Sequence, residues 1–497
     1  MPTLIGLIHI RNKVKIIPII LVAVIQLLFV TGCSRWTDVS AQSDDIPVIF
    51  PDYKEVTVPC NIAPLNFMVE GADRILAVFI CNGTSVLEVK GPQGILDIPQ
   101  KKWREMLEES KGGEIEVEVS VWNDDYPQGI SYKPFSIRVS EDEIDAWVAY
   151  RLIEPGYVSW RQLGIYQRDL TSFREKAIVT NRNTTTTCLN CHSFPAYSPE
   201  SMMLHARGNN GGTILYHNGD VFKADFSRTS PIKSVTYPAW HPDGRYIAFS
   251  ANTTHQVFFA EGRQPIEVFD TASDLVIYDT VLDEVITDSR FMTAASLETF
   301  PSWSSDGKYL YFASYTSDVL PVELTLDMQY DLLRVEFDPQ TGRFGELVET
   351  IYDASEMGGS ISHPRLSPDG HHLLYTIADY GTFPVWHREA DLQMLDIKTM
   401  ELKDISVWND ADEADSYHSW SSNGRWVVYG SRRLDGRYTR LFIAHMDEYG
   451  CPHKPFLMPQ KDPRYNVWRL RSFNVPELVK GEVTLPREVR RMFMDND

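Results

Sequence analysis

Tyr237-Pro-Ala-Trp-His-Pro-Asp-Gly-Arg-Tyr-Ile247 is the stretch that decides the fold, because its pattern returns along the chain. Each copy opens on an aromatic or His residue, passes through an acidic or Asn turn position and continues into an apolar strand. The turn position falls at residues 200, 243, 306, 369 and 423, which gives a repeat of 43 to 63 residues. A unit of this size cannot bury both faces of its sheet alone, so the repeats predict small sheets arranged radially.

The form Pro-x-Trp-Ser/His-Pro-Asp-Gly-Arg-x-Ile-x-Phe-Ser resembles the TolB-like β-propeller repeat over roughly residues 190 to 450. The copies at Tyr237 and Phe300 fit well. The copy at His363 fits less well because Leu366 replaces Trp, and the copy at Phe194 has Glu-Ser in place of Asp-Gly. The family commonly has about six blades. With five copies visible, a sixth blade would use residues 464–479 or strands that precede the repeats.

The predicted fold class is therefore all-β. A TolB-like β-propeller of about six blades occupies residues 188–480 and is followed by a C-terminal tail, 481–497. A small β-sandwich-like domain of immunoglobulin or fibronectin kind precedes it over residues 50–140. Residues 141–187 are a connector.

Local patterns predict individual elements in these segments. Glu114–Trp122 alternates charged and apolar residues, as a strand with one face in water does. A helix is predicted just after Pro99, because Pro is favoured in a first helical turn and apolar residues follow on one face. In the connector, Glu141–Leu152 has the apolar spacing of a helix.

Cys188-Leu-Asn-Cys191-His192 is a Cys-x-x-Cys-His motif, the attachment signature of a c-type haem. Two cysteines at this spacing can form thioethers to the two vinyl groups of one porphyrin, and the adjacent His then lies under the iron. The motif predicts one covalent haem c on Cys188 and Cys191, with His192 as an axial ligand. We interpret the motif as the lead-in to the first repeat. A Cys188–Cys191 disulfide and a zinc site are the alternatives, although no second Cys or His pair stands at ligand spacing.

The second iron ligand is predicted from the turn that follows the motif. If residues 198–201 reverse the chain, residues 204–207 return beside Cys191. His205 would then be the second axial ligand. His255, the Met202–Met203 pair and an open sixth position are the alternatives.

The start of the chain is an export signal. A basic segment is followed by the apolar run Ile16–Val30 and then by Thr-Gly-Cys33. This resembles a bacterial lipoprotein signal, which implies a signal peptide over residues 1–33, lipid on Cys33 and a tether over 34–49. An uncleaved membrane anchor is the alternative. Both place the folded part in the cell envelope, outside the cytoplasm, and the lipoprotein reading places it at the outer membrane, facing the periplasm or the cell surface.

Export agrees with covalent haem attachment, which takes place on the exported side. It also permits a disulfide between Cys60 and Cys81. The net charge of −21 argues against nucleic acid or an anionic membrane surface as a partner of the folded part. Membrane contact would come through the lipid anchor, and a basic redox partner would be attracted.

Together these features predict a lipid-anchored, c-type cytochrome-like protein whose propeller carries one haem and transfers electrons. One alternative is a haem enzyme acting on peroxide or a small oxide. Another is a propeller scaffold that binds protein or glycan. No catalytic residue set is predicted.

Overall fold

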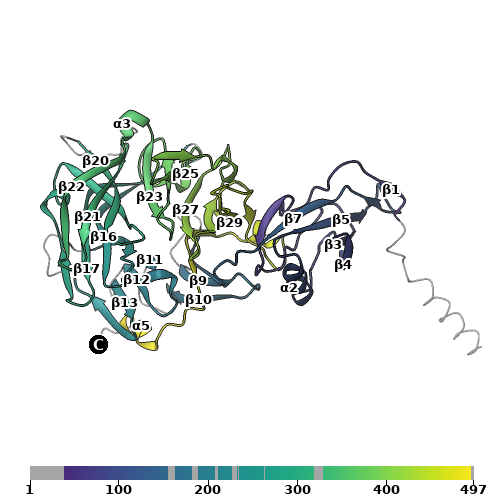
Figure 1. Ribbon diagram of the computed structural model, residues 1–497, viewed down its shortest axis with the longest axis horizontal. Helices are drawn as coiled ribbons and strands as arrows, with labels where there is room; N and C mark the ends of the chain where they lie inside the picture. Colours follow the sequence, from purple (N-terminus) through teal and green to yellow (C-terminus); the bar gives the residue numbers. More distant parts are fainter. Residues whose placement is uncertain are drawn as a thin grey trace, which may run out of the picture.

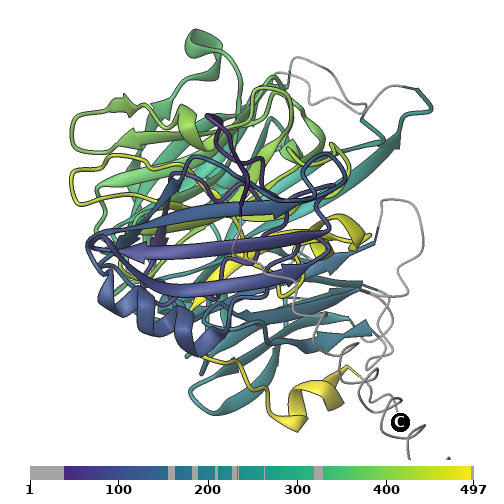
Figure 2. The ribbon, with the colours of Figure 1, turned by 90° about the vertical axis from the view of Figure 1, so that its right-hand side faces the viewer.

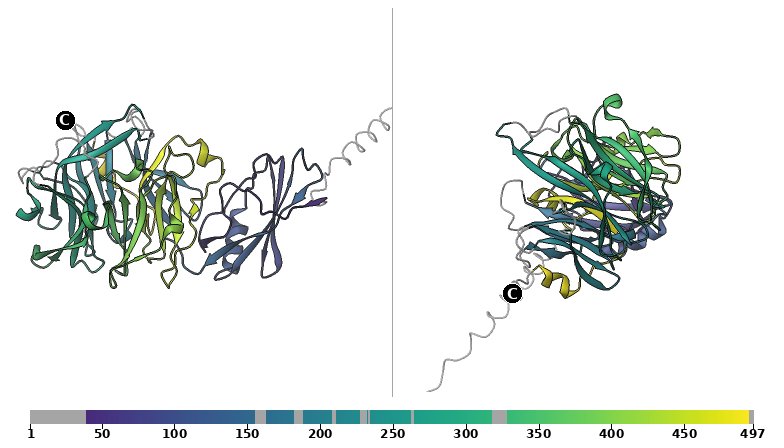
Figure 3. Two further views of the ribbon diagram at one scale, coloured as in Figure 1. Left: turned by 90° about the horizontal axis from the view of Figure 1, so that it is seen from above. Right: turned by 90° about the vertical axis from the view of Figure 1, so that its left-hand side faces the viewer.

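The computed structural model describes residues 39–154, 163–181, 188–207, 211–226, 232, 234–261, 264–317 and 328–493. The predicted signal peptide and Cys33 lie outside the described residues. Figure 1 shows an N-terminal domain beside a larger propeller, and the view from above in Figure 3 shows the same two bodies next to each other.

The N-terminal domain is built on one seven-stranded sheet. Five strands follow the order β1-β6-β5-β3-β4, and β7 pairs with both β5 and β2. Exposed and buried residues alternate from Glu114 to Val119 in β5, as predicted. The helix predicted after Pro99 is also confirmed as α2 (Gln100–Glu109), which buries Trp103, Met106 and Leu107. The strands are β1 (Ala41–Gln42), β2 (Val56–Pro59), β3 (Arg74–Cys81), β4 (Thr84–Pro92), β5 (Glu114–Trp122), β6 (Ile130–Ser131) and β7 (Phe135–Ser140).

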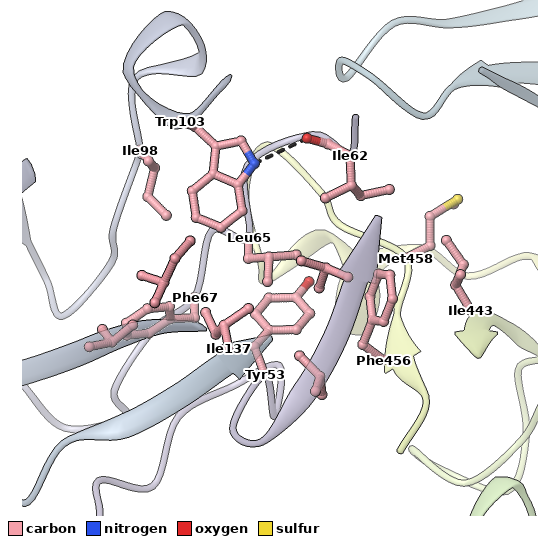
Figure 4. Packing of buried hydrophobic residues seen from close by; sticks show 14 of the residues in the cluster. Tyr53, Ile62, Leu65, Phe67, Ile98, Trp103, Ile137, Ile443, Phe456 and Met458 are labelled. Atoms are coloured by element: carbon pink, nitrogen blue, oxygen red, sulfur yellow. Dashed lines mark hydrogen bonds between the residues drawn. The ribbon is translucent and has the colours of Figure 1, made fainter. Parts of the chain in front are cut away.

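The two bodies share one hydrophobic core. Tyr53 and Leu65 of the N-terminal domain belong to the same buried cluster as Ile443, Phe456 and Met458 of the propeller. Figure 4 shows these side chains packed together, with the Trp103 indole donating to the Ile62 carbonyl oxygen at 3.1 Å. In Figure 2 the strands of the N-terminal domain lie directly in front of the propeller. The contact is therefore a packed interface.

The propeller is assembled from strands that pair in groups of four. In the described part of the chain the groups are β11–β14, β15–β18, β19–β22, β23–β26, β27–β30 and the group β10-β9-β8-β31. One parallel pair, Ser273 with Leu297, joins the second group to the third. The first strands β11, β15, β19, β23, β27 and β31 contact one another in succession. They are the innermost strands, and the arrangement is a β-propeller.

The strands of these groups have the following bounds: β8 (Trp147–Ile153), β9 (Gly164–Asp169), β10 (Glu175–Thr180), β11 (Cys188–Ser193), β12 (Met202–Arg207), β13 (Gly212–His217), β14 (Asp220–Ala224), β15 (Thr236–Trp240), β16 (Tyr246–Phe258), β17 (Ile266–Asp279), β18 (Glu284–Ile286), β19 (Ser296–Trp303), β20 (Tyr309–Thr316), β21 (Asp331–Asp338), β22 (Arg343–Tyr352), β23 (Ser360–Leu366), β24 (His372–Ala378), β25 (Asp391–Asp396), β26 (Glu401–Lys403), β27 (Asp415–Trp420), β28 (Trp426–Ser431), β29 (Arg440–His445), β30 (Phe456–Leu457) and β31 (Ser472–Val479). Short helices lie between them: α3 (Ala354–Met357), α4 (Tyr465–Trp468) and the 3₁₀ turns η3 (Pro195–Tyr197), η4 (Ser289–Phe291), η5 (Pro384–Trp386) and η6 (Ser406–Trp408).

The ring is closed by a sheet that combines strands from before and after the repeats. The late strand β31 pairs with β8, and β9 and β10 complete that sheet. The helix predicted over 141–152 is wrong, because residues 141–146 form no helix and β8 begins at Trp147. Both faces of β8 are buried: Val148 and Tyr150 face one core, and Trp147 and Ala149 face another. A strand buried on both faces loses the alternation that would have identified it.

A layer of rings lies where the innermost strands meet. Tyr237, Phe300, His363 and Tyr417 occupy the same irregular position in successive innermost strands, and each has a positive φ near 50°. Ring centroids are 4.3 Å apart for Tyr237 and Phe300, 4.0 Å for Phe300 and His363, and 4.7 Å for His363 and Tyr417. Positive φ in a non-glycine residue costs about 1–3 kcal/mol, so packing of the rings has to outweigh it. We call these four residues the ring layer.

The segment predicted as a C-terminal tail folds back onto the propeller. It contains helix α5 (Arg487–Met492), and Val489 and Phe493 enter the buried cluster that holds Leu189, Leu204 and Ile214. This end of the chain therefore covers the sheet that carries the Cys-x-x-Cys-His motif.

Candidate functional site

The Cys-x-x-Cys-His motif forms the innermost strand β11 itself. Cys188 pairs with Arg207, and His192 pairs with Leu204. The interpretation of the motif as a lead-in to the repeat is therefore corrected. The register shift falls at Asn190 and Cys191, where the next sheet has Tyr237 and Pro238. Phe194, which the sequence aligned with Tyr237, instead precedes a 3₁₀ turn that Pro195 initiates.

His192 is buried, and its ring nitrogens have no hydrogen-bond partner at ordinary length. Its side chain is 2% exposed, and neither ring nitrogen makes a hydrogen bond of ordinary geometry, although longer contacts with the backbones of Ala149 and Val475 act as weak hydrogen bonds and oppose the lowering of its pKa. Burial, together with the positive charges of Arg151 and Arg365, lowers the pKa of His192 to about 3. The ring is therefore neutral, the form in which imidazole binds a metal. Leaving a buried polar group unsatisfied costs about 1–3 kcal/mol.

The two cysteines of the motif are free thiols, so the alternative of a disulfide between Cys188 and Cys191 is not formed. Arg151 Nη2 donates to Cys188 Sγ at 3.6 Å. Burial raises the pKa of Cys191, and the backbone of Tyr237 and the charges of Arg207 and Arg151 oppose this.

The disulfide considered between Cys60 and Cys81 is also absent, since both thiols are free and buried. Ser110 Oγ lies 3.0 Å from Cys81 Sγ, while Cys60 Sγ faces the Glu141 carbonyl oxygen at 3.7 Å. Each sulfur has its own polar neighbour.

His205 does return beside the motif, but its side chain faces away from His192. Residues opposite each other in a sheet share a face, so His192 shares a face with its partner Leu204, and the next residue, His205, lies on the other. The His205 Nδ1 atom lies 2.9 Å from Thr213 Oγ1. Burial and the nearby charges of Arg207 and Lys223 lower the pKa of His205 to about 4. This geometry does not support His205 as the second iron ligand.

The other ligand candidates lie in different surroundings, and Met202 is the one that shares a face of β12 with Leu204, the partner of His192. His255 lies on the exposed part of the β16–β17 hairpin, where its ring stacks on Phe269 with centroids 5.7 Å apart. Met202 and Met203 are fully buried in two different apolar clusters. Within the residues described, no group of three or more His, Cys, Asp or Glu side chains forms a metal site.

Two arginines that the sequence analysis did not single out act on the Tyr417 phenol, and one of them, Arg151, also contacts the motif through Cys188. Arg151 comes from β8 and Arg432 follows β28, and both act on the charge of the Tyr417 phenol, as Cys191 also does. Burial raises the pKa of Tyr417 to about 12, and a hydrogen bond with Asn474 opposes the rise. We call Arg151 and Arg432 the arginine pair. The two residues are far apart in the sequence, so no local pattern could have revealed them.

The residues fit a covalent c-type haem by their chemistry. The attachment chemistry needs two reduced cysteines, and both are reduced. The iron needs a neutral imidazole with an uncommitted nitrogen, and His192 is the histidine in the described chain with both ring nitrogens buried and unbonded. Such a haem would supply one-electron redox chemistry.

One cavity of about 300 Å³ lies away from this site. It is lined by the N-terminal domain and by the segment after β29, including Glu55, Thr57, Arg138, His453 and Lys454. Its lining carries both signs of charge and none of the predicted site residues.

Comparison with known proteins gives limited matches. No family model matches the chain. An uncharacterised protein of Agrobacterium fabrum is 29% identical over 138 residues, which is 28% of this chain and 38% of that relative. The matched part therefore spans well under half of the relative's length.

Solved structures with some likeness include TolB of Acinetobacter baumannii, at 15% identity and a TM-score of 0.43, covering 76% of this chain and 85% of that one. A dipeptidyl peptidase 4 of Porphyromonas gingivalis has 10% identity and a TM-score of 0.32, covering 62% and 46%. A periplasmic gluconolactonase of Pseudomonas aeruginosa has 14% identity and a TM-score of 0.33, covering 63% and 97%. The propeller assignment rests on the strand pairing described above.

The helices in the described residues are all too short or too polar to cross a membrane.

Proposed function

We propose that this protein is an exported, lipid-anchored, c-type cytochrome-like protein that carries one haem on its propeller and transfers electrons. The observation that carries the proposal is His192: a neutral, buried imidazole, directly after two reduced cysteines at haem-attachment spacing, with both nitrogens unbonded. Cys188 and Cys191 would hold the porphyrin through thioethers, and His192 would bind the iron.

We favour electron transfer over chemistry on a substrate because the ring layer packs close to the motif. The ring layer lies beside Cys191, whose thiol acts on the charges of Tyr237 and Tyr417. These rings pack against one another, so a substrate that approached from their side would have to displace them to reach the motif. Electrons need no such displacement. The net charge of −21 would favour a basic redox partner.

The test is covalent attachment in cells that contain haem-attachment machinery. Denatured wild-type protein should retain haem on a gel and give the pyridine haemochrome of a c-type haem. Cys188→Ala should reduce this attachment, whereas Cys451→Ala, which removes an exposed cysteine elsewhere, should leave it unchanged. Colourless wild-type protein with both thiols unmodified would overturn the proposal.

One observation favours a haem enzyme as the second candidate. His205 faces away from His192, so β12 does not supply the expected ligand on the far side of the iron. An open position would admit peroxide or a diatomic gas. Rapid binding of carbon monoxide by the reduced wild-type protein would move this candidate ahead of electron transfer, and a spectrum unaffected by the gas would support electron transfer.

A further inference from the structure

The three residues of the haem-attachment motif have the spacing of one face of a helical turn. Residues three and four apart lie on the same face of a helix, and Cys191 and His192 follow Cys188 at these two distances. In a strand, successive side chains point to opposite faces, so neighbours and residues three apart are on opposite faces. A haem bonded to both cysteines and bound by His192 requires the three side chains on one side of the backbone.

The structure divides these side chains between the two faces of the sheet β11–β14. Cys191 packs on the buried cluster that contains Met203. His192 pairs with Leu204, the residue after Met203 in β12, so it lies on the opposite face. Leu204 belongs there to a second cluster, together with Ala149, whose backbone contacts the His192 ring. While β11 keeps this register, one haem cannot be bonded to Cys191 and also bound by His192.

Few interactions hold the strand at the motif. A register shift leaves residues 190–191 without a partner in β12, and pairing is confined to residues 188–189 before the shift and 192–193 after it. In the described part of the chain β11 pairs with β12 alone, so it is the edge strand of its sheet. The His192 ring nitrogens are buried without a hydrogen-bond partner of ordinary length, which is unfavourable. The strand form of the motif therefore has few pairs and an internal cost.

The chain directly after the motif is fixed in place. The Phe194 backbone N–H donates to Glu477 Oε2 at 3.2 Å. Pro195 begins the 3₁₀ turn η3, which the Ser198 N–H closes by donating to the Pro195 carbonyl oxygen at 2.9 Å. A change of conformation in the motif can therefore end at Ser193 and leave the rest of the sheet where it is.

We propose that residues 188–192 form a strand in the haem-free protein and leave β12 for a helical turn when haem is attached. The turn brings Cys188, Cys191 and His192 to one side of the backbone, which the strand does not. Strands β12, β13 and β14 stay paired in both states. This inference rests on the proposed function, since it presupposes haem on the two cysteines.

Hydrogen exchange followed by mass spectrometry tests the two states on the full-length wild-type protein. Haem-loaded protein comes from cells with haem-attachment machinery, and haem-free protein comes from cells without it. The backbone amides of β12 that bond to β11 should exchange at least about tenfold faster in the haem-loaded protein, because they lose their acceptors. The amides of β16 that bond to β15, the equivalent pair in the next sheet, are the matched control and should exchange at the same rate in both forms.

The outcomes separate this inference from the proposed function. Haem-loaded protein whose β12 amides are as protected as in the haem-free form overturns the change of conformation and leaves the proposed function standing. Loss of protection throughout β12, β13 and β14 would show that the whole sheet opens, and unprotected β12 amides in the haem-free protein would show that β11 is not a strand there. Either result also overturns the inference. Wild-type protein that never carries covalent haem overturns the proposed function itself.

Discussion

At the scale of single residues, the ring layer shows side chains held in an unfavourable backbone conformation by their neighbours. Phe300 has φ 51°, is 4% exposed and lies between the rings of Tyr237 and His363. Replacing a buried Phe by Ala removes about 3–5 kcal/mol of stability. The backbone strain remains in the Ala variant and is relieved by glycine, which tolerates positive φ.

We therefore expect Phe300→Gly to be more stable than Phe300→Ala by about 1 kcal/mol, although both are less stable than the wild type. Urea unfolding followed by tryptophan fluorescence measures the difference. Phe344 is the control, since its ring likewise packs on an aromatic ring, that of Phe291, but its φ is not positive. At residue 344 the order of stability should reverse, so we expect Phe344→Gly to be less stable than Phe344→Ala. The same order at both positions would count against strain at Phe300.

His205 gives a second prediction at this scale. Because it faces Thr213 and not His192, His205→Ala should leave the absorption spectrum of the haem unchanged. His192→Ala, in contrast, should alter it by removing the axial ligand. Stability should fall in His205→Ala, since Thr213 Oγ1 loses its buried partner, at a cost of about 1–3 kcal/mol. A change of spin state in His205→Ala would show that the iron recruits this side chain after all.

At the scale of elements, the hairpin β16–β17 links distant sheets. Glu267 near the start of β17 is fully buried and lies 2.6 Å from Nε2 of His387, which follows η5 in the group β23–β26. Burial opposes a charge on His387, but Glu267 and Glu389 outweigh it and raise the pKa of His387 to about 9. Gln264 reinforces the contact by donating to Glu267.

This pair predicts a loss of stability in alkali. His387 has its proton in the folded state up to a pH of about 9, whereas an unfolded His loses it near 6.5. The stabilisation is therefore complete below pH 6.5 and disappears as the pH rises to 9, by on the order of 3 kcal/mol. Urea unfolding of the wild type across this range should show the decline.

Glu267→Gln should flatten that decline, because it removes the charge that holds the proton on His387. Glu389→Gln should have a smaller effect, since the Glu389 side chain is 40% exposed. An unchanged slope in Glu267→Gln would assign the pH dependence to other groups.

Comparison of elements also shows how far a sequence can predict this structure. Strand β5 and helix α2 were predictable, since local alternation marks the first and a proline marks the start of the second. The register of β11 was not, because its irregular position holds Asn190 and Cys191 in place of the usual aromatic-proline pair. Cys188, Cys191 and His192 are adjacent in the sequence and could be predicted together. The arginine pair and the orientation of His205 depend on pairings between distant strands.

At the scale of the whole molecule, the shared core fixes the N-terminal domain to the propeller. Asp145 accepts hydrogen bonds from the backbone and hydroxyl of Ser422 at 2.6 and 2.7 Å, and Asn66 donates to the Lys461 carbonyl oxygen at 2.8 Å. The proposed anchor at Cys33 precedes the N-terminal domain, so it would tether both bodies as one unit.

We expect labelled fatty acid to enter the wild-type protein and not Cys33→Ser. The variant should be released from the membrane fraction or remain unprocessed, because the lipid-modified residue is missing. Cys451→Ser, which changes an exposed cysteine of the propeller, should still incorporate the label. An intact segment 1–32 on mature wild-type protein would contradict lipoprotein processing.

The seam between β8 and β31 sets an order of assembly. His192 lies near the backbone of Val475 in β31, and β31 is the last of the described strands to be synthesised. Until that strand arrives, β11 lies beside an open gap in the ring. If haem is attached as proposed, its ligation has to precede closure, so biogenesis has a time window that ends when the C-terminal strand docks. Slow docking of β31 would then favour protein that carries haem, and docking before attachment would leave protein without haem.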